Sequence, residues 1–342
     1  MPDCIQIGTS ERPLRVAIVG AGPAGFHAAM ALLESNEPTV EVDLFDRLPT
    51  PYGLIRAGVA PDHQKIKSVT HWYERIGQDP RFAFFGKVEL GRDVTVEDLA
   101  THYDQILFAT GNEGDRRLGV PGEHLLGCLP ASVFVGWYNG HPDFQTATVN
   151  LTARRAVVIG NGNVALDVAR ILLKDPAELA KTDIAEHALL ALRRSLVEEV
   201  VIVGRRGPMD AAFTPAELKE LLNLPNVSLH IGASELILDA AQRRHLEGLS
   251  PKAPARRNYE LLNSAAASQG AGSGRSLEFR FYCSPLEFLD DGAGNLVSVV
   301  LRDNRSAGDS ADGVVCSDLN VGAALVSIGN EGKRIPGVPY DE

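Results

Sequence analysis

Short apolar runs alternate with longer helical patterns along this chain, and the alternation predicts strands that are each followed by a helix. Near the N-terminus, the apolar run Val16–Val19 leads into the glycine-rich segment 20–25. A helical stretch follows at residues 26–33, and a second apolar run ends on the acid Asp46. The pattern therefore predicts a strand, a tight glycine turn, a helix and a second strand within 14–46.

The glycine turn predicts a binding site for the phosphates of a dinucleotide. Gly20 permits the tight turn, Gly22 lets a pyrophosphate approach the backbone, and Gly25 lets the helix pack on the strand. The N-terminus of the helix offers free N–H groups and the positive end of its dipole. Asp46 lies 21 residues after Gly25 (46 − 25), near the spacing of about 20 for an acid that binds ribose hydroxyls. The alternative is a glycine-rich turn that binds no ligand.

The same pattern returns in the second half of the chain. Residues 157–159 predict a strand, 160–165 a glycine turn (Gly160, Asn161, Gly162, Asn163, Val164, Ala165) and 166–173 a helix. The next predicted strand, 199–203, is followed by Arg205 and Arg206. Two arginines there would bind a 2′-phosphate through charge-assisted hydrogen bonds, whereas Asp46 would repel one. We therefore predict an FAD site in the first unit and an NADP(H) site in the second, the alternative being a solvated arginine pair.

These repeated units predict an α/β fold with two Rossmann-like, three-layer dinucleotide-binding domains. Two similar segments, 109–114 and 327–332, are expected to follow strands of the same type of sheet. Residues 48–63 are expected to be irregular, 65–75 helical and 94–99 a short connection. Residues 251–276 are rich in Ala, Gly and Ser and predict a loop with at most one short helical stretch, around 259–262. Residues 277–283, 286–289 and 296–301 predict an antiparallel meander.

Composition narrows the functional class. The chain has 342 residues, 44% hydrophobic and 23% charged, which predicts a globular protein of about two domains. Its net charge of −11 argues against nucleic acid as a partner. No run of 18 apolar residues predicts a membrane span, and the N-terminus has no secretory pattern. The four cysteines are scattered without a CxxC motif, so neither a metal site nor a redox disulfide is expected and a cytoplasmic location fits.

Several long strings then resemble one enzyme family. The strings 48–65, 134–142, 160–173 and 203–208 are together similar to the adrenodoxin-reductase-type ferredoxin–NADP⁺ reductases, including the actinobacterial ones. The resemblance runs from about Arg15 to Asp341. It implies an FAD enzyme that transfers electrons between NADPH and a small, acidic iron–sulfur ferredoxin, by hydride transfer to the flavin. It also implies an NADP domain, 116–329, inserted into an FAD domain formed by 1–115 and a return segment from 330.

Matched by motif, the resemblance also implies the binding residues. FAD would contact Ala24, Asp46, Leu54 and Leu90, and NADP would contact Asn161, Gly162, Asn163, Val164, Arg205, Arg206 and Glu217. The family often has Glu where Asp46 stands, and Asp keeps the acceptor. His63 and Glu217 match residues near the flavin and the nicotinamide, so both are candidate catalytic residues that handle a proton. The alternative is that His63 orders the flavin loop and Glu217 orders the nicotinamide.

The family continues beyond the position of Glu342 and there carries a Gly-Trp and an Arg-Gly-Pro-Thr-Gly pattern that close over the flavin. Neither pattern occurs in this chain, so a truncated product or fragment is expected, with a nearly complete NADP domain and poor FAD affinity. Three hypotheses stay open. The chain is an FAD-dependent NADPH–ferredoxin reductase, another flavoenzyme such as a glutamate synthase reductase subunit, or a fragment that binds NADP(H) without flavin activity. The missing CxxC argues against a disulfide reductase.

Overall fold

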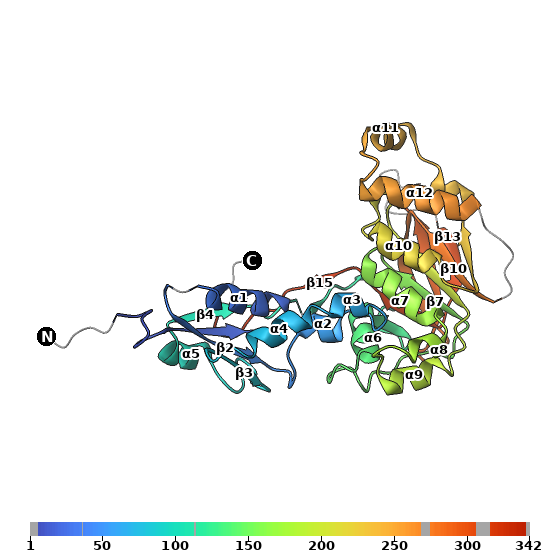
Figure 1. Cartoon of the computed structure of the whole chain (residues 1–342). Helices are drawn as coiled ribbons and strands as arrows, with labels where there is room; N and C mark the ends of the chain where they lie inside the picture. Colours follow the sequence, from blue (N-terminus) through green and yellow to red (C-terminus); the bar gives the residue numbers. More distant parts are fainter. Residues whose placement is uncertain (1–5, 36, 113, 268–273, 306–314, 340–342) are drawn as a thin grey trace. The chain divides into compact units, whose positions relative to one another are not determined.

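The chain folds into two compact units (Figure 1). Unit 1 comprises residues 1–115 and 330–342, and unit 2 comprises residues 116–329. The computed structural model describes residues 6–35, 37–112, 114–267, 274–305 and 315–339, with the side chains of 315–317 left out. Within these residues, no helix has the length and apolar character needed to cross a membrane.

Unit 1 is built on a four-stranded parallel sheet with the order β3-β2-β1-β4. The strands are β1 (Leu14–Val19), β2 (Val40–Asp46), β3 (Phe82–Gly86) and β4 (Gln105–Phe108). Helix α1 (Pro23–Leu33) connects β1 to β2. The predicted strand, glycine turn, helix and second strand are therefore confirmed.

Both faces of this sheet are buried, which gives unit 1 three layers. Val16 and Ile18 pack against α1 and α4 (Thr70–Ile76), while Ala17 and Val19 pack against α5 (Val96–His102). Successive residues of a strand point to opposite faces, so an unbroken apolar run indicates burial on both sides. The expected connection at 94–99 is wrong, because α5 begins there. Thr95 and Asp98 form a capping box at its N-terminus, a signal that the sequence already contained.

The segment between β2 and β3 includes three short helices. It contains α2 (Gly53–Ala57), α3 (Gln64–Lys67) and α4. The irregular segment expected at 48–63 thus includes one short helix, and the helix expected at 65–75 is divided between α3 and α4.

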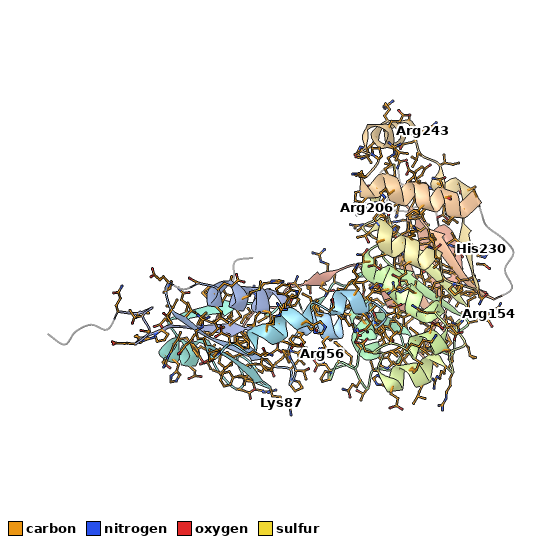
Figure 2. The ribbon with its side chains drawn as sticks, in the orientation of Figure 1. Arg56, Lys87, Arg154, Arg206, His230 and Arg243 are labelled. Carbon is orange, nitrogen blue, oxygen red and sulfur yellow. The ribbon has the colours of Figure 1, made fainter. Side chains whose placement is uncertain are left out.

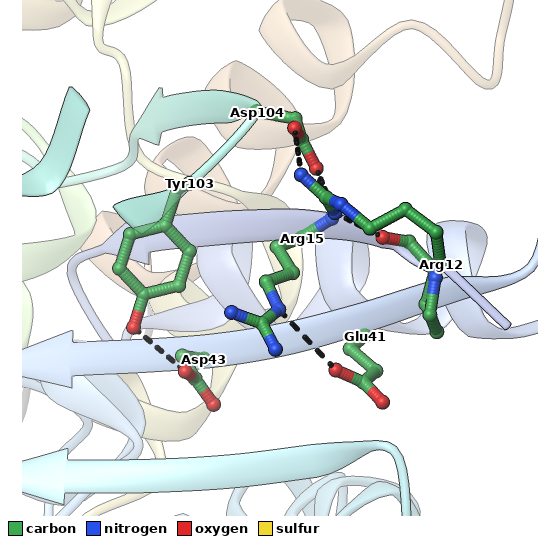
Figure 3. Close-up of polar contacts among 7 residues, drawn as sticks. Arg12, Arg15, Glu41, Asp43, Tyr103 and Asp104 are labelled. Carbon is green, nitrogen blue, oxygen red and sulfur yellow. Dashed lines mark hydrogen bonds and ion pairs between the residues drawn. The ribbon is translucent and has the colours of Figure 1, made fainter. Parts of the chain in front are cut away.

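A polar cluster ties the segment before β1 to the start of β4 (Figure 3). Arg12 donates two hydrogen bonds to the Asp104 carboxylate, at 2.8 and 2.9 Å. The same carboxylate accepts from the backbone N–H of Arg15 at 2.9 Å. The hydrogen bonds from Arg12 hold the pKa of Asp104 below its ordinary value. Beside this cluster, the Tyr103 hydroxyl donates to Asp43 on β2 at 2.7 Å.

Unit 2 is built on a six-stranded parallel sheet with the order β6-β14-β7-β8-β10-β9. Its strands are β6 (Cys128–Pro130), β7 (Arg155–Ile159), β8 (Glu199–Val203), β9 (Val227–Ile231), β10 (Arg275–Arg280) and β14 (Ala323–Val326). The helices of unit 2 are α6 (Ala131–Tyr138), α7 (Asn163–Leu173), α8 (Pro176–Leu179), α9 (Glu186–Leu192), α10 (Pro215–Leu222), α11 (Ala240–Gly248) and α12 (Pro254–Ala267).

The two faces of this sheet are covered differently. Val158 and Ile202 contribute to a large core with helices α6, α7, α9, α10 and α12. Val157 and Val201 face the opposite side, where they pack against an antiparallel sheet. Its strands are β11 (Cys283–Asp290), β12 (Leu296–Asp303) and β13 (Val315–Asn320). Unit 2 therefore also has three layers, helices on one face and a small sheet on the other.

Two predictions for this part of the chain are wrong. Residues 254–267 form helix α12, where a mostly irregular loop was expected; its residues Asn258 and Leu262 are buried, and Asn258 donates to the Phe213 carbonyl at 2.8 Å. The last part of the expected loop, 268–273, lies outside the described residues. Residues 275–280 form β10, which joins the parallel sheet between β8 and β9, so the antiparallel sheet begins only at Cys283.

The two similar segments follow equivalent strands, as predicted. β4 and β14 each pair in parallel with the strand that precedes the glycine turn of their own unit, β1 and β7. Beyond them, β5 (Gly114–Asp115) and β15 (Asn330–Glu331) pair with each other in antiparallel orientation. The chain therefore leaves and re-enters unit 1 through two neighbouring extended segments.

Candidate functional site

The glycine turn of unit 1 has the geometry that its sequence predicted. Gly20 has a φ of 111°, and a Cβ there would collide with the Ala109 carbonyl. A Cβ on Gly25 would collide with the carbonyl of Gly20. A Cβ on Gly22 would meet no atom within 4 Å in the described structure, so its backbone faces open space. This arrangement fits a turn that is compressed against its own strands and open toward a ligand.

Asp46 braces this turn from the end of β2. Its carboxylate accepts a hydrogen bond from the backbone N–H of Ala21 at 2.8 Å and another from Leu48 at 2.8 Å. The backbone N–H of Tyr52 donates to the Ala21 carbonyl at 2.7 Å. Asp46 was predicted to accept hydrogen bonds from ribose hydroxyls. In the structure it orients the glycine turn of its own unit. Sequence reasoning missed this role of Asp46.

The other predicted FAD contacts lie on the same unit but differ in exposure. Ala24 is exposed on the first turn of α1, and Leu54 is 66% exposed on α2. Leu90 is partly buried and packs against the core under the sheet. His63 precedes α3, where its carbonyl accepts from the Ile66 N–H at 3.0 Å.

The glycine turn of unit 2 repeats the arrangement of unit 1. Gly160 has a φ of 139°, and a Cβ there would collide with the Ser327 carbonyl. A Cβ on Gly162 would meet no described atom within 4 Å. Asn163 accepts from the backbone N–H of Thr214 at 2.8 Å, which ties the turn to the segment before α10. Val164 is 45% exposed at the start of α7, whereas Ala165 is buried in the position of the third glycine.

A cavity of about 880 Å³ opens in unit 2 beside this turn. It is lined by Gly160, Asn161 and Gly162, and by the backbone and side chains that follow β8. Asp210 is the one acidic residue among its described lining. Five arginines border the cavity: Arg116, Arg117, Arg205, Arg206 and Arg302. This charge balance suits a polyanionic ligand. Sequence reasoning had singled out Arg205 and Arg206 and missed the other three arginines.

The small antiparallel sheet holds the Arg205–Arg206 loop in place. The backbone N–H of Tyr282 donates to the Arg206 carbonyl at 3.2 Å, and that of Cys283 donates to the Gly204 carbonyl at 3.0 Å. The Asn304 side chain donates to the Arg205 carbonyl at 2.8 Å. The backbone is thus anchored while both arginines remain exposed. Arg206 is labelled in Figure 2.

Glu217 lies in a buried ionic cluster between α7 and α10. Arg170 has no exposed surface, and its guanidinium lies 2.8 Å from Asp167, 3.5 Å from Glu217 and 3.5 Å from Glu220. The N–H of Glu217 also donates to the side chain of Thr214 at 3.3 Å. The Glu217 carboxylate is therefore held in a defined position by the guanidinium of Arg170, which is fully buried.

The donor set of unit 2 fits an NADP(H) molecule. The cavity combines a glycine turn, the N-terminus of α7 and an arginine-rich rim, which are the features that bind pyrophosphate and 2′-phosphate groups. The side-chain oxygen of Asn161 is buried in the cavity wall without a hydrogen-bond partner in the described part of the chain. A ligand with donor groups would satisfy it.

Comparisons with known proteins agree with this geometry. Residues 14–241 match the family model described as pyridine nucleotide-disulphide oxidoreductase. The chain is 45% identical to the NADPH-ferredoxin reductase FprA of Mycobacterium leprae, over 96% of this chain and 73% of that protein. It is 42% identical to the mitochondrial NADPH:adrenodoxin oxidoreductase of Arabidopsis thaliana, over 97% of this chain and 71% of that protein.

A solved structure shows the same fold. The structure of Mycobacterium tuberculosis FprA in complex with NADPH superposes with a TM-score of 0.89 and 43% identity, covering 96% of this chain and 74% of that one. The identity, the coverage and the two glycine turns agree on one assignment. The chain belongs to the ferredoxin–NADP⁺ reductases of the adrenodoxin-reductase type, within the pyridine nucleotide-disulphide oxidoreductases.

Proposed function

We propose that the protein is an FAD-dependent oxidoreductase that transfers electrons between NADPH and a ferredoxin-type iron–sulfur protein. The observation that carries this proposal is the cavity of unit 2, where a glycine turn lies beside Arg205 and Arg206. A second glycine turn, braced by the acid Asp46, supplies a site of the opposite charge in unit 1. Membership of the reductase family supports the pairing of the two cofactors.

The two units divide the work of binding. In this proposal, residues 1–115 and 330–342 bind FAD and residues 116–329 bind NADP(H). FAD contacts would come from Gly20, Gly22, Ala24, Gly25, Asp46, Leu54 and Leu90. NADP(H) contacts would come from Gly160, Asn161, Gly162, Asn163, Val164, Arg205, Arg206 and Glu217. Bound FAD would supply the redox chemistry, which is uptake of a hydride from NADPH and release of electrons one at a time.

The protein's own contribution is orientation. Backbone N–H groups of the two glycine turns bind the pyrophosphates, and Arg205 and Arg206 distinguish NADP(H) by its 2′-phosphate. Glu217, held by Arg170, orders the nicotinamide end of the dinucleotide, and His63 orders the flavin loop. Hydride transfer itself needs no protein base. The role proposed for Glu217 and His63 is therefore to orient the cofactors rather than to transfer a proton.

The electron-transfer partner in this proposal is a small acidic ferredoxin. Exposed arginines are available for docking on unit 2, although the whole chain has a net charge of −11. Arg243 and Arg244 lie on α11, where Arg243 is exposed (Figure 2). Arg257 on α12 and Arg193 and Arg194 after α9 are also exposed, whereas Arg256 on α12 is half-buried and pairs with Glu260 at 2.9 Å. A cytoplasmic location suits the scattered cysteines of the chain.

Reconstituted electron transfer tests the proposal. The purified chain is supplied with saturating FAD and NADPH, and cytochrome c reduction is followed with and without an added acidic ferredoxin. We expect reduction that requires both FAD and the ferredoxin. Its rate should fall steeply as ionic strength rises, because charged docking faces speed association at low salt.

Two controls give the experiment its force. Omitting FAD should abolish electron transfer, and replacing the ferredoxin with buffer should leave only slow direct reduction. If the chain binds NADP⁺ but transfers no electrons under saturating FAD, it is an NADP(H)-binding protein and the proposed reductase activity is wrong.

A further inference from the structure

We propose that Arg302 is a further dinucleotide-binding residue, whose guanidinium binds a phosphate group of NADP(H) alongside Arg205 and Arg206. This inference rests on the proposed binding of NADP(H) by unit 2. Arg302 lies on β12 of the small antiparallel sheet. This sheet is not part of the strand–turn–helix motif from which the sequence predicts the site.

Arg302 carries a charge that nothing in the described part of the chain neutralises. It lies near the end of β12 and is half-buried. Its Nε atom is buried without a hydrogen-bond partner, and no hydrogen bond or ion pair of its side chain is found among the described residues. Burial of a donor on a cation is costly unless an acceptor is supplied. A bound anion would supply that acceptor.

Neighbouring arginines in the same region show that carboxylate partners are available there. Arg305 donates to Asp303 at 2.8 Å, and Arg280 donates to Glu278 at 2.7 Å. Asp303 is adjacent to Arg302 in sequence, yet its carboxylate binds Arg305. Since successive strand residues point to opposite faces, Asp303 is directed away from the face that Arg302 occupies. Arg302 therefore faces the cavity in place of an internal partner.

The position of Arg302 relates it to the Arg205–Arg206 loop. Arg302 pairs with Ser284 across β11 and β12, and both residues line the cavity. Two positions further on, Asn304 also lines the cavity, and its side chain binds the Arg205 carbonyl at 2.8 Å. Asn304 directly follows the end of β12, and residues two apart along a chain lie at most about 7 Å from each other. An arginine side chain can span such a distance, so Arg302 and the loop can act on one ligand.

The charge of the cavity favours phosphate as the group that Arg302 binds. Five arginines and a single acid, Asp210, border the cavity in the described structure. Phosphate oxygens match the planar fork of a guanidinium, which binds them through paired N–H groups. NADP(H) offers two such groups, the 2′-phosphate near Arg205 and Arg206 and the pyrophosphate at the Gly160–Gly162 turn.

Binding measurements on an Arg302→Met variant test the inference. Met keeps much of the length of the side chain but removes its charge and its donors. Dissociation constants for NADP⁺, NAD⁺ and 2′-AMP are measured by titration calorimetry on the full chain. We expect NADP⁺ affinity to fall about tenfold, the effect of losing one charge-assisted contact. Arg302→Lys should retain part of the affinity, because it keeps the charge without the fork.

The ligand series distinguishes the two phosphates. Weaker binding of NADP⁺ and 2′-AMP with unchanged NAD⁺ would place Arg302 at the 2′-phosphate. Equal weakening of NADP⁺ and NAD⁺ with unchanged 2′-AMP would place it at the pyrophosphate. Either result supports the inference.

Arg154→Met is the matched control, because Arg154 is an exposed arginine of unit 2 that pairs with Glu198 and lies outside the cavity lining. We expect its affinities to stay within about twofold of the parent chain. If Arg302→Met and Arg302→Lys both bind all three ligands like the parent, the inference is overturned while the proposed function stands. A parent chain that binds no NADP⁺ would instead overturn the proposed function itself. Matching thermal melting curves exclude a folding defect as the cause of any loss.

Discussion

Asp46 is the last residue of β2 and Arg205 lies two residues after the end of β8, and their charges are opposite. Asp46 uses both carboxylate oxygens to accept from the backbone of its own unit. Arg205 is held through its backbone carbonyl, which leaves its guanidinium exposed at the cavity. In the function proposed above, the acid at one strand end would repel a 2′-phosphate and the arginine after the other strand would attract it.

Glu235 provides a pH-dependent prediction at the residue scale. Burial raises its pKa from the ordinary 4.5 to about 7, although its carboxylate accepts from the Phe281 N–H at 2.7 Å. The folded state therefore favours the protonated acid more strongly than the unfolded state does. Its contribution to stability is complete below the unfolded pKa and is lost as pH rises through the folded pKa.

We expect Glu235→Gln to remove this dependence, because the amide oxygen can still accept from Phe281 and never ionises. Relative to the variant, the parent chain should lose about 1–2 kcal/mol of unfolding free energy between about pH 5 and about pH 8, a figure discounted for the partial exposure of the group. Urea denaturation at both pH values measures the difference. A parent-to-variant difference that is the same at both would contradict the prediction.

At the scale of elements, helices α7 and α10 are joined through one buried cation. Arg170 contacts Asp167 one turn earlier on α7, and Glu217 and Glu220 on α10. Removing the cation would take away the buried charge that Asp167 and Glu217 face, and these two side chains are only 14% and 16% exposed. Breaking a buried ion pair from one side is much more costly than losing a surface pair.

We therefore expect Arg170→Met to lower the free energy of unfolding by about 3–5 kcal/mol. Chemical denaturation of the variant beside Arg154→Met gives the measurement. Arg154 is exposed, and its pair with Glu198 should contribute less than about 1 kcal/mol. Equal effects of the two substitutions would show that the α7–α10 cluster does not depend on Arg170.

Elements whose pattern is local were predictable, and those that depend on distant packing were not. The runs before both glycine turns, 16–19 and 156–159, are apolar and lie in central parallel strands. Helix α12 has only two leucines among alanine and polar residues, so its apolar pattern is weak. It is stabilised by buried contacts of Asn258 and Leu262 with distant residues. β10 has strand character in the sequence, but its parallel neighbours are far away along the chain.

At the scale of the whole molecule, the chain contains two units with separate cores. Two core clusters belong to unit 1 and two to unit 2 among the described residues. The chain passes between the units twice, at residues 115–116 and 329–330. Because each unit encloses its own apolar core, we expect calorimetric unfolding in two transitions.

We expect NADP⁺ to raise the temperature of one transition and FAD that of the other. A ligand at 100 times its dissociation constant stabilises the unit that binds it by about 2.7 kcal/mol. Differential scanning calorimetry with each cofactor alone measures the shifts, and NAD⁺ serves as the weaker-binding comparison. If saturating NADP⁺ shifts neither transition, the assignment of unit 2 to NADP(H) is wrong.

The sequence by itself determined the α/β class, the two glycine turns and the opposite charges at the ends of their second strands. These features are local, because a tight turn requires glycine and a buried strand requires an apolar run wherever they occur. Only the tertiary structure decided which distant residues join each turn. Asp46 accepts a hydrogen bond from the loop of its own glycine turn. Arg302 lines the unit 2 cavity although its sheet contains no cofactor-binding motif. Such neighbours are chosen by the order of strands and the packing of layers, which no short segment of the chain specifies.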